Sequence, residues 1–318
     1  MGYELLRSNR NYRLILSSSV VANLGDGVVA VAMPWLATLL TRDPMMIAAV
    51  AMAGRLPWFL FALPAGVWTD RVDRRLLMIR ADAVRLALML GVVGLTLSIP
   101  VSPIAPGSEI GLMATLAAIA FLLASAEVVR DNAAQTVLPS IVARESLERA
   151  NGQMWSAEQV MGRFVGPPLA GVLIAAGIAV PFGVNTATLS LSIGIVWLIT
   201  LPVQSPAESK RFWPALREGL AWMRDNPVIL RLAVMLGVIN AIAVGGLTIL
   251  VLYAQEVLHL DATGYGLLLT CAAAGGVLGG LFAPEVARRI GMRASLIAAL
   301  SSFVLLHALL GLCSSAPL

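Results

Sequence analysis

Charged residues are scarce in this sequence, and long polar segments are scarcer. Only 13% of the 318 residues are charged, whereas 58% are hydrophobic, and the mean hydropathy is +0.86. A soluble domain carries about 25% charged residues, and so large an apolar excess does not fit inside one core. The composition therefore excludes an ordinary soluble enzyme and predicts a membrane protein.

The residue types that build metal and nucleophilic sites are nearly missing. Two histidines, His259 and His307, and two cysteines, Cys271 and Cys313, stand far apart in the chain. Their spacing matches neither a zinc site nor a disulfide framework. The chain has no G-x-x-x-x-G-K-[ST] loop, no G-x-S-x-G turn and no H-E-x-x-H pair. We therefore expect no cofactor, no metal, no ATP hydrolysis and no enzymatic activity.

What the sequence has is long apolar runs. A spanning helix needs about 20 mostly apolar residues, and nine such stretches follow one another. They cover 14–40, 45–68, 76–99, 110–134, 157–178, 181–201, 231–254, 262–286 and 294–314. The runs do not alternate as barrel strands do. The prediction is an all-α, polytopic membrane protein in a bilayer.

The arginines give the predicted orientation. With the N-terminus in the cytoplasm, the inner loops hold nearly all the basic loop residues, and the outer loops hold Arg42 alone. This loop bias also explains the net charge of +4, because no aromatic–basic interleaving typical of nucleic-acid binding accompanies it. We expect a multi-pass protein of the plasma membrane that binds no nucleic acid.

A polar, proline-containing stretch divides the chain. The predicted parts are a six-helix bundle, 1–201, a cytoplasmic linker, 202–230, and an incomplete second bundle of about three helices, 231–318. The two parts also show a weak internal repeat, in which Asn23 of the first matches Asn240 of the second.

Two motifs resemble those of the major facilitator superfamily. The loop after the second span has the pattern G-x-x-x-D-R-x-G-R-[RK], matched by Gly66, Asp70, Arg71, Arg74 and Arg75, with Asp73 where the superfamily usually has glycine. The fifth span resembles the antiporter motif G-x-x-x-G-P-x-x-x-G, matched by Gly162, Gly166, Pro167 and Gly171, with an atypical Arg163. Ordinary loop bias and plain helix packing are the structural alternatives.

Together with the segments NLGDG and LPSIVARESLERANG, these motifs are similar to one branch of that superfamily. The branch includes the enterobactin exporter and macrolide efflux proteins. The resemblance implies a secondary active transporter that exports a small amphipathic organic molecule in exchange for protons. It also implies that the loop motif gates the conformational change.

Ionisable residues inside the spans are the candidate proton or substrate pathway, because charge in a membrane is costly and usually functional. Asp26 and Arg55 lie roughly 18 and roughly 20 Å deep in the first two spans at 1.5 Å per residue. The two charges are therefore near one depth and are candidates for an ion pair. Glu127 and Arg130 add a polar centre in the fourth span. Asn23 and Asn240 are candidates for hydrogen bonds to substrate, and a purely structural role is the alternative for each.

The superfamily fold has two bundles of six helices, so the resemblance implies that the last three are missing here. Three interpretations stay open. The chain is a truncated exporter, a non-transporting membrane remnant that acts as a binding or assembly subunit, or a homo-oligomer that completes its own second bundle.

Overall fold

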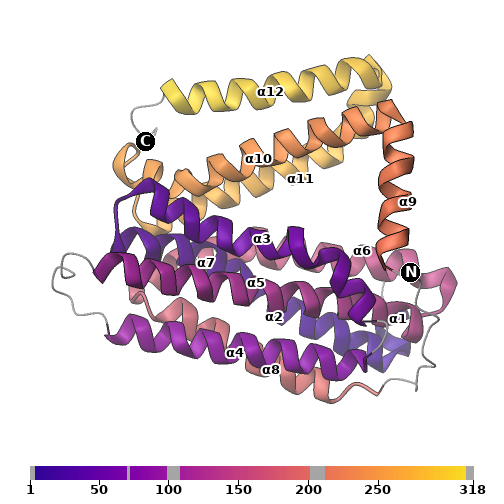
Figure 1. The fold of residues 1–318 in the computed structure, drawn as a ribbon, viewed down its shortest axis with the longest axis horizontal. Helices are drawn as coiled ribbons and strands as arrows, with labels where there is room; N and C mark the ends of the chain where they lie inside the picture. The colour runs from indigo at the N-terminus through magenta and orange to yellow at the C-terminus, as the bar shows by residue number, and fades with distance from the viewer. Residues whose placement is uncertain (1–3, 70–71, 99–107, 201–211, 313–318) are drawn as a thin grey trace.

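The computed structural model describes residues 4–69, 72–98, 108–200 and 212–312, and all regular structure within these ranges is helical. The long helices form two groups (Figure 1). Helices suit a chain buried in lipid, because they satisfy their backbone N–H and C=O groups internally. The predicted all-α membrane fold is confirmed.

The first group comes from the N-terminal two thirds of the chain. α2 packs on α7 and α8, α3 packs on α5, and α4 contacts both α5 and α8. The group contains α1 (Glu4–Ser8), α2 (Arg10–Leu40), α3 (Pro44–Thr69), α4 (Arg74–Ser98), α5 (Ser108–Ile141), a 3₁₀ turn η1 (Arg144–Ser146), α6 (Leu147–Glu158), a π-helical segment η2 (Gln159–Val165), α7 (Gly166–Ala176) and α8 (Val180–Trp197).

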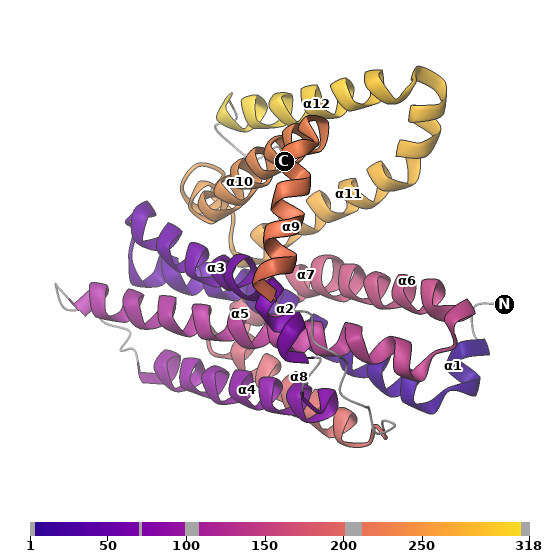
Figure 2. The ribbon, with the colours of Figure 1, turned by 45° about the vertical axis from the view of Figure 1, so that its right-hand side comes forward.

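The second group is smaller. It consists of α9 (Phe212–Asp225), α10 (Pro227–Glu256), α11 (Ala262–Ile290) and α12 (Met292–Leu312). α10 packs against α3, α11 packs against α7, and α12 packs against α11. α9 runs across the direction of the long helices and leads into α10 (Figure 2).

Every predicted span overlaps a helix. Seven stretches among the described residues are long and apolar enough to cross a bilayer, and α12 adds a shorter apolar stretch, Arg293–Leu306. The remaining predicted span, 76–99, corresponds to α4, which carries buried charges.

Several helices continue past the predicted span ends. α5 runs to Ile141, and the next helical run starts at Leu147 and continues through η2 into α7, so the loop expected between these spans shrinks to a short turn around η1. Hydropathy marks the part of a helix inside the bilayer, whereas the helix itself ends where its backbone hydrogen bonds end. Of the predicted linker 202–230, residues 202–211 lie outside the described residues, and the rest contains α9 and the start of α10.

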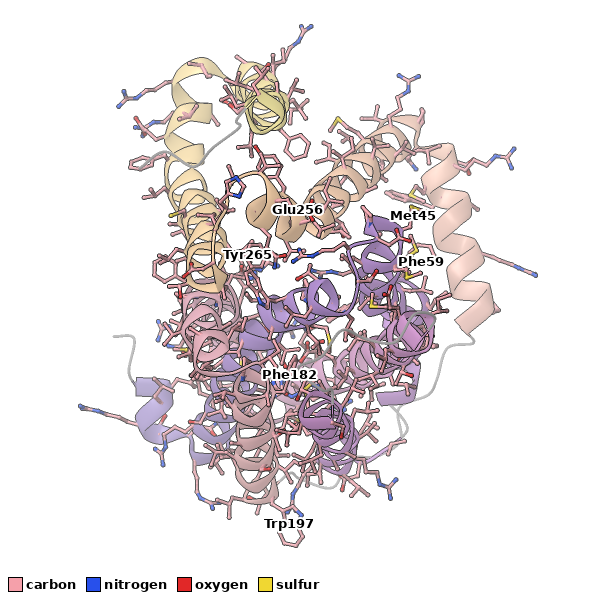
Figure 3. The ribbon with its side chains drawn as sticks, turned by 90° about the vertical axis from the view of Figure 1, so that its left-hand side faces the viewer. Met45, Phe59, Phe182, Trp197, Glu256 and Tyr265 are labelled. Carbon is pink, nitrogen blue, oxygen red and sulfur yellow. The ribbon has the colours of Figure 1, made fainter. Side chains whose placement is uncertain are left out.

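Among the described residues, the buried apolar core that the two groups share lies at one end. The end near Arg42 contains a buried cluster that includes Val28 and Leu36 of α2, Val251 of α10 and Tyr265 of α11. A second cluster, toward the opposite end, contains only residues of the first group. Figure 3 shows Tyr265 and Glu256 where the groups meet, and Phe182 inside the first group.

α2 and α7 approach each other through glycine. A Cβ added to Gly166 would lie 2.6 Å from the Cα of Gly27, and a Cβ on Gly27 would meet the backbone of Gly162. η2 precedes this crossing, and the Gly166 N–H donates to the Met161 carbonyl five residues back. Small residues allow such close backbone contact in membranes.

We expect Gly166→Ala to lower the free energy of unfolding by roughly 1–3 kcal/mol, because the new methyl group overlaps backbone atoms that have no side chain to move. Thermal unfolding of the purified protein in detergent measures the effect. Gly94→Ala is the matched control, because nothing lies within 4 Å of an added Cβ there. Equal unfolding midpoints for the two variants would contradict the close crossing.

Candidate functional site

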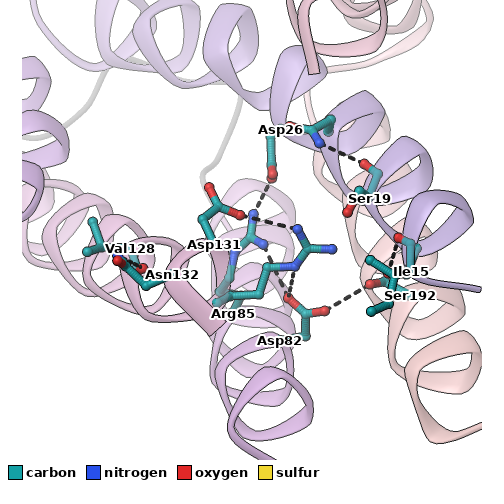
Figure 4. A network of polar contacts seen from close by, with 12 residues as sticks. Ile15, Ser19, Asp26, Asp82, Arg85, Val128, Asp131, Asn132 and Ser192 are labelled. Carbon is teal, nitrogen blue, oxygen red and sulfur yellow. Dashed lines mark hydrogen bonds and ion pairs between the residues drawn. The ribbon is translucent and has the colours of Figure 1, made fainter. Parts of the chain in front are cut away.

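Five charged residues from three helices meet inside the first group. Asp26 belongs to α2, Asp82 and Arg85 to α4, and Arg130 and Asp131 to α5. We call these five residues the charge cluster (Figure 4). All three helices are apolar over most of their length, so the cluster concentrates charge where the bilayer would otherwise be driest.

Asp82 is the centre of the charge cluster. It is fully buried. Its Oδ1 lies 3.3 Å from Arg85 Nη1 and 3.7 Å from Arg130 Nε. Its Oδ2 accepts a hydrogen bond from Ser192 Oγ of α8 at 2.9 Å. One carboxylate thus forms ion pairs with two arginines from two helices, α4 and α5, and is oriented by a third helix, α8.

Each arginine contacts a second carboxylate. Arg85 Nη2 pairs with Asp26 Oδ1, and Arg130 Nη1 lies 3.2 Å from Asp131 Oδ1. The side chains of Asp26 and Asp131 are 24% and 31% exposed, whereas those of the arginines are only 3–4% exposed. The outer carboxylates therefore remain accessible, and the arginines lie behind them.

The candidate ion pair between Asp26 and Arg55 is not formed. The Asp26 side chain pairs with Arg85, and Arg55 is exposed on α3. The cause is the packing, because α3 lies mainly against α5 while α2 turns toward α7 and α8. Equal depth in neighbouring helices does not make two side chains face each other.

The other predicted pathway residues divide into two sets. Arg130 belongs to the charge cluster, and Glu127 is partly buried within electrostatic range of Asp26, Arg85, Asp131 and Arg55. The two asparagines bond within their own helices: Asn23 donates to the Ser19 carbonyl and Asn240 to the Leu236 carbonyl, both at 2.8 Å. Asn240 is exposed and lies in the second group.

Asp82, Arg85, Asp131 and Ser192 were not among the predicted site residues. A signal for two of them was present, since Asp82 and Arg85 are oppositely charged residues three positions apart within the apolar span 76–99. Asp131 adjoins Arg130 at the end of its predicted span. Ser192 gives no sequence signal, because serine is ordinary in membrane helices.

Part of the loop motif after the second span lies within the described residues. Gly66 lies in α3, and Asp70 and Arg71 lie outside the described residues. Arg74 Nη1 donates to the Thr136 carbonyl of α5 at 2.7 Å. Arg75 donates to the Trp197 carbonyl of α8 and lies 5.5 Å from the centre of the Trp197 ring. These contacts fix the start of α4 to its two neighbours.

The antiporter-like motif, which lies in η2 and α7, takes part in two close helix contacts. Gly162 and Gly166 face α2, as described above, and Pro167 is buried at the start of α7. Gly171 faces the other way, since a Cβ there would lie 2.7 Å from the Thr263 Cα of α11. The motif therefore contacts both helix groups.

The two groups also meet through polar side chains at the Arg42 end. Gln255 Nε2 of α10 donates to Thr38 Oγ1 at 2.9 Å, and Arg42 Nη1 lies 3.7 Å from Glu256 Oε1. Nearby, the Trp35 and Tyr265 rings lie 6.0 Å apart. The Arg42–Glu256 pair is more than half exposed, so the apolar and aromatic contacts contribute most of the contact energy there.

Membrane transporters are among the polytopic helical bundles that bury ionisable residues at their centre. Residues 6–318 match the model of the major facilitator family described as transmembrane secretion effector, and the chain belongs to that family. It is not an enzyme family.

Curated relatives are multidrug efflux pumps. The chain is 27% identical over 304 residues to the multidrug efflux pump Tap of Mycolicibacterium fortuitum, covering 90% of this chain and 69% of the relative. It is 29% identical over 299 residues to Tap of Mycobacterium tuberculosis strain H37Rv, covering 89% of this chain and 68% of the relative.

Solved structures share the fold. An inward-facing bacterial homologue of the iron transporter ferroportin has a TM-score of 0.63 and 19% identity over 92% of this chain and 71% of its own. An inward-facing, unoccupied bacterial homologue of the human lysosomal transporter Spinster has a TM-score of 0.63 and 16% identity. The match covers 88% of this chain but only 63% of that homologue's length.

We expect Asp82→Asn to lower the free energy of unfolding by roughly 3–5 kcal/mol, because it leaves two buried arginines without their shared carboxylate. Ser192→Ala should cost only about 1 kcal/mol, the contribution of one hydrogen bond. Unfolding in mixed micelles of increasing dodecyl sulfate content measures both. The exposed Glu145→Gln is the control, and an Asp82→Asn midpoint equal to that of the control would show that Asp82 is not the centre of the network.

Proposed function

We propose that the protein is a proton-coupled efflux transporter for small amphipathic organic molecules. It lies in the plasma membrane with its N-terminus in the cytoplasm. The observation that carries this proposal is the charge cluster, in which a partly accessible carboxylate, Asp26, adjoins an arginine held in place from behind. Family membership and the efflux-pump relatives support export.

Asp26 is the proposed proton carrier. When it is ionised, it pairs with Arg85, and Arg85 also binds Asp82. When Asp26 takes up a proton, the attraction to Arg85 is lost, and the guanidinium is left with Asp82 as its charged partner. Protonation of one accessible carboxylate thereby weakens the link between α2 and α4, and such a change in contacts is what a two-state transport cycle needs.

The arrangement of the two groups supports alternating access. They join at the Arg42 end through an apolar core and the Thr38–Gln255 hydrogen bond, and the core at the other end holds first-group residues only. With the Arg42 end outside, as the arginine distribution predicts, the proposed state is closed to the exterior. Export then requires these outer contacts to separate while the inner ends approach.

We expect Asp26→Asn to abolish protonophore-sensitive export while leaving expression and membrane insertion intact, because the amide keeps the size of the side chain and cannot carry a proton. Accumulation of a fluorescent dye in expressing cells, with and without a protonophore, measures export. Glu145→Gln, an exposed carboxylate outside the charge cluster, is the control.

Normal export by Asp26→Asn would contradict the assigned role and leave Asp26 as a packing residue. If the unmodified chain lowers accumulation and the protonophore has no effect, the transport proposal stands without proton coupling. If the unmodified chain does not lower accumulation in any condition, transport by this chain is contradicted, and the binding or assembly role becomes the better account.

A further inference from the structure

A polar pocket lies at the end of the first helix group where α2 begins. Its volume is about 570 Å³, which is within the range of small-molecule sites. It is formed by α1, the start of α2, the turn between α5 and α6, and the residue that follows α8. We call it the N-terminal pocket. Its polar lining residues are Ser8, Asn9, Arg10, Asn11, Ser146 and Thr200.

The walls of the N-terminal pocket are fastened to one another. Asn9 Nδ2 donates to the Ile141 carbonyl of α5 at 2.5 Å. Asn11 Nδ2 donates to the Thr200 carbonyl at 2.6 Å. On the remaining side, Arg13 Nη1 donates to two carbonyls of α1 and holds that short helix against α2. The pocket is therefore formed without a ligand, and the amide nitrogens of its two asparagines are already used.

The N-terminal pocket carries a positive charge. Arg10 is its one ionisable lining residue in the described part of the chain, and no carboxylate lines it. Arg10 is exposed and forms no ion pair with a described residue. The first turn of α2 adds backbone N–H groups that have no carbonyl partner inside the helix. A guanidinium beside free N–H donors is suited to an anion with several oxygen atoms, such as a phosphate ester.

The N-terminal pocket lies at the level of the lipid headgroups. Arg10 precedes the predicted span 14–40 by roughly 6 Å at 1.5 Å per residue, and the headgroup region borders the hydrocarbon core there. Trp197 and Leu198, next to Thr200 in sequence, are 65% and 54% exposed. Figure 3 shows Trp197 at the edge of the molecule, pointing away from the helices. A polar, basic pocket thus has exposed apolar side chains near it, as an amphiphilic ligand requires.

We propose that the N-terminal pocket binds the phosphate group of an anionic phospholipid. Arg10 and the first N–H groups of α2 bind the phosphate, and the acyl chains lie against Trp197 and Leu198. The bound lipid is not a substrate. It connects the start of α2 with the ends of α5 and α8, so it stabilises three of the helices that surround the charge cluster.

Thermal unfolding of the purified chain in neutral detergent tests this proposal, because a ligand that binds the folded state raises the unfolding midpoint. Three additives are compared: phosphatidylglycerol, phosphatidylcholine and glycerol 3-phosphate. The first and third share the phosphate ester, and the first and second share the acyl chains. We expect phosphatidylglycerol to raise the midpoint in a saturable manner and the other two to have little effect.

Variants separate the pocket from general attraction between opposite charges. Arg10→Gln should lower the affinity for phosphatidylglycerol by roughly tenfold or more, because a charge-assisted hydrogen bond is lost. Arg10→Lys should retain more of the affinity than Arg10→Gln. Ala143→Trp should also lower it, because the indole fills the pocket without changing its charge. The matched control is Arg293→Gln, which removes an exposed arginine outside the pocket and should leave the affinity unchanged.

Equal losses of affinity in Arg10→Gln and Arg293→Gln would overturn the proposal, since the lipid would then be attracted by overall charge. An equal rise of the midpoint with glycerol 3-phosphate would assign the pocket to a soluble phosphate instead of a lipid. An equal rise with phosphatidylcholine would contradict recognition of an anion. All these measurements report binding, so their outcome does not depend on whether the chain transports a substrate.

Discussion

The buried carboxylate of Asp82 is the interaction on which the centre of the first helix group depends. It binds Arg85 and Arg130 and accepts a hydrogen bond from Ser192, so it ties α4, α5 and α8 together. Without it, two guanidinium groups would lie close together in an apolar bundle, where charge repulsion is weakly screened. The Asp82 carboxylate stabilises both arginines in the buried interior. Arg85 in turn pairs with Asp26, and Arg130 pairs with Asp131.

This arrangement separates structural charge from exchangeable charge. Asp82, Arg85 and Arg130 are nearly or fully buried, so they have little chance to exchange protons or ligands with water. Asp26 and Asp131 are the accessible members. In the proposed transport cycle, the accessible groups change partners while the buried groups keep the helices in place. The exposure of each side chain therefore indicates its role better than its residue type does.

The sequence was sufficient to predict the helices but not the contacts between them. Apolar runs near the length of a bilayer predicted the long helices of the described residues, because hydropathy depends on local composition. Pairing between charges depends on how each helix is rotated about its axis, and this is decided by packing between distant segments. Asp26 and Arg55 have matching depth, but α3 turns toward α5 and the Asp26 side chain meets Arg85 instead.

A close look at Asp82 and Arg85 would have found part of the site. Two opposite charges one helical turn apart inside an apolar run have few explanations other than a buried pair or a functional site. Ser192 is different, because its role appears only when α8 is placed beside α4. The glycines of η2 and α7 are an intermediate case: their spacing indicates a close helix contact, and only the fold shows that α2 and α11 are the partners.

The residues next to Asp26 on α2 limit which helix can shift when Asp26 is protonated or ionised. Gly25 packs against Asn185 and Thr188 of α8, and Gly27 packs against the backbone of Gly162, so the α2 backbone is held on both sides of the carboxylate. A backbone in such contact has little room to shift. When Asp26 gains or loses a positive partner, the response therefore passes to the other side of the ion pair, to Arg85 and through Asp82 to Arg130 on α5. The glycines fix one side of the site so that the charge change acts on the other.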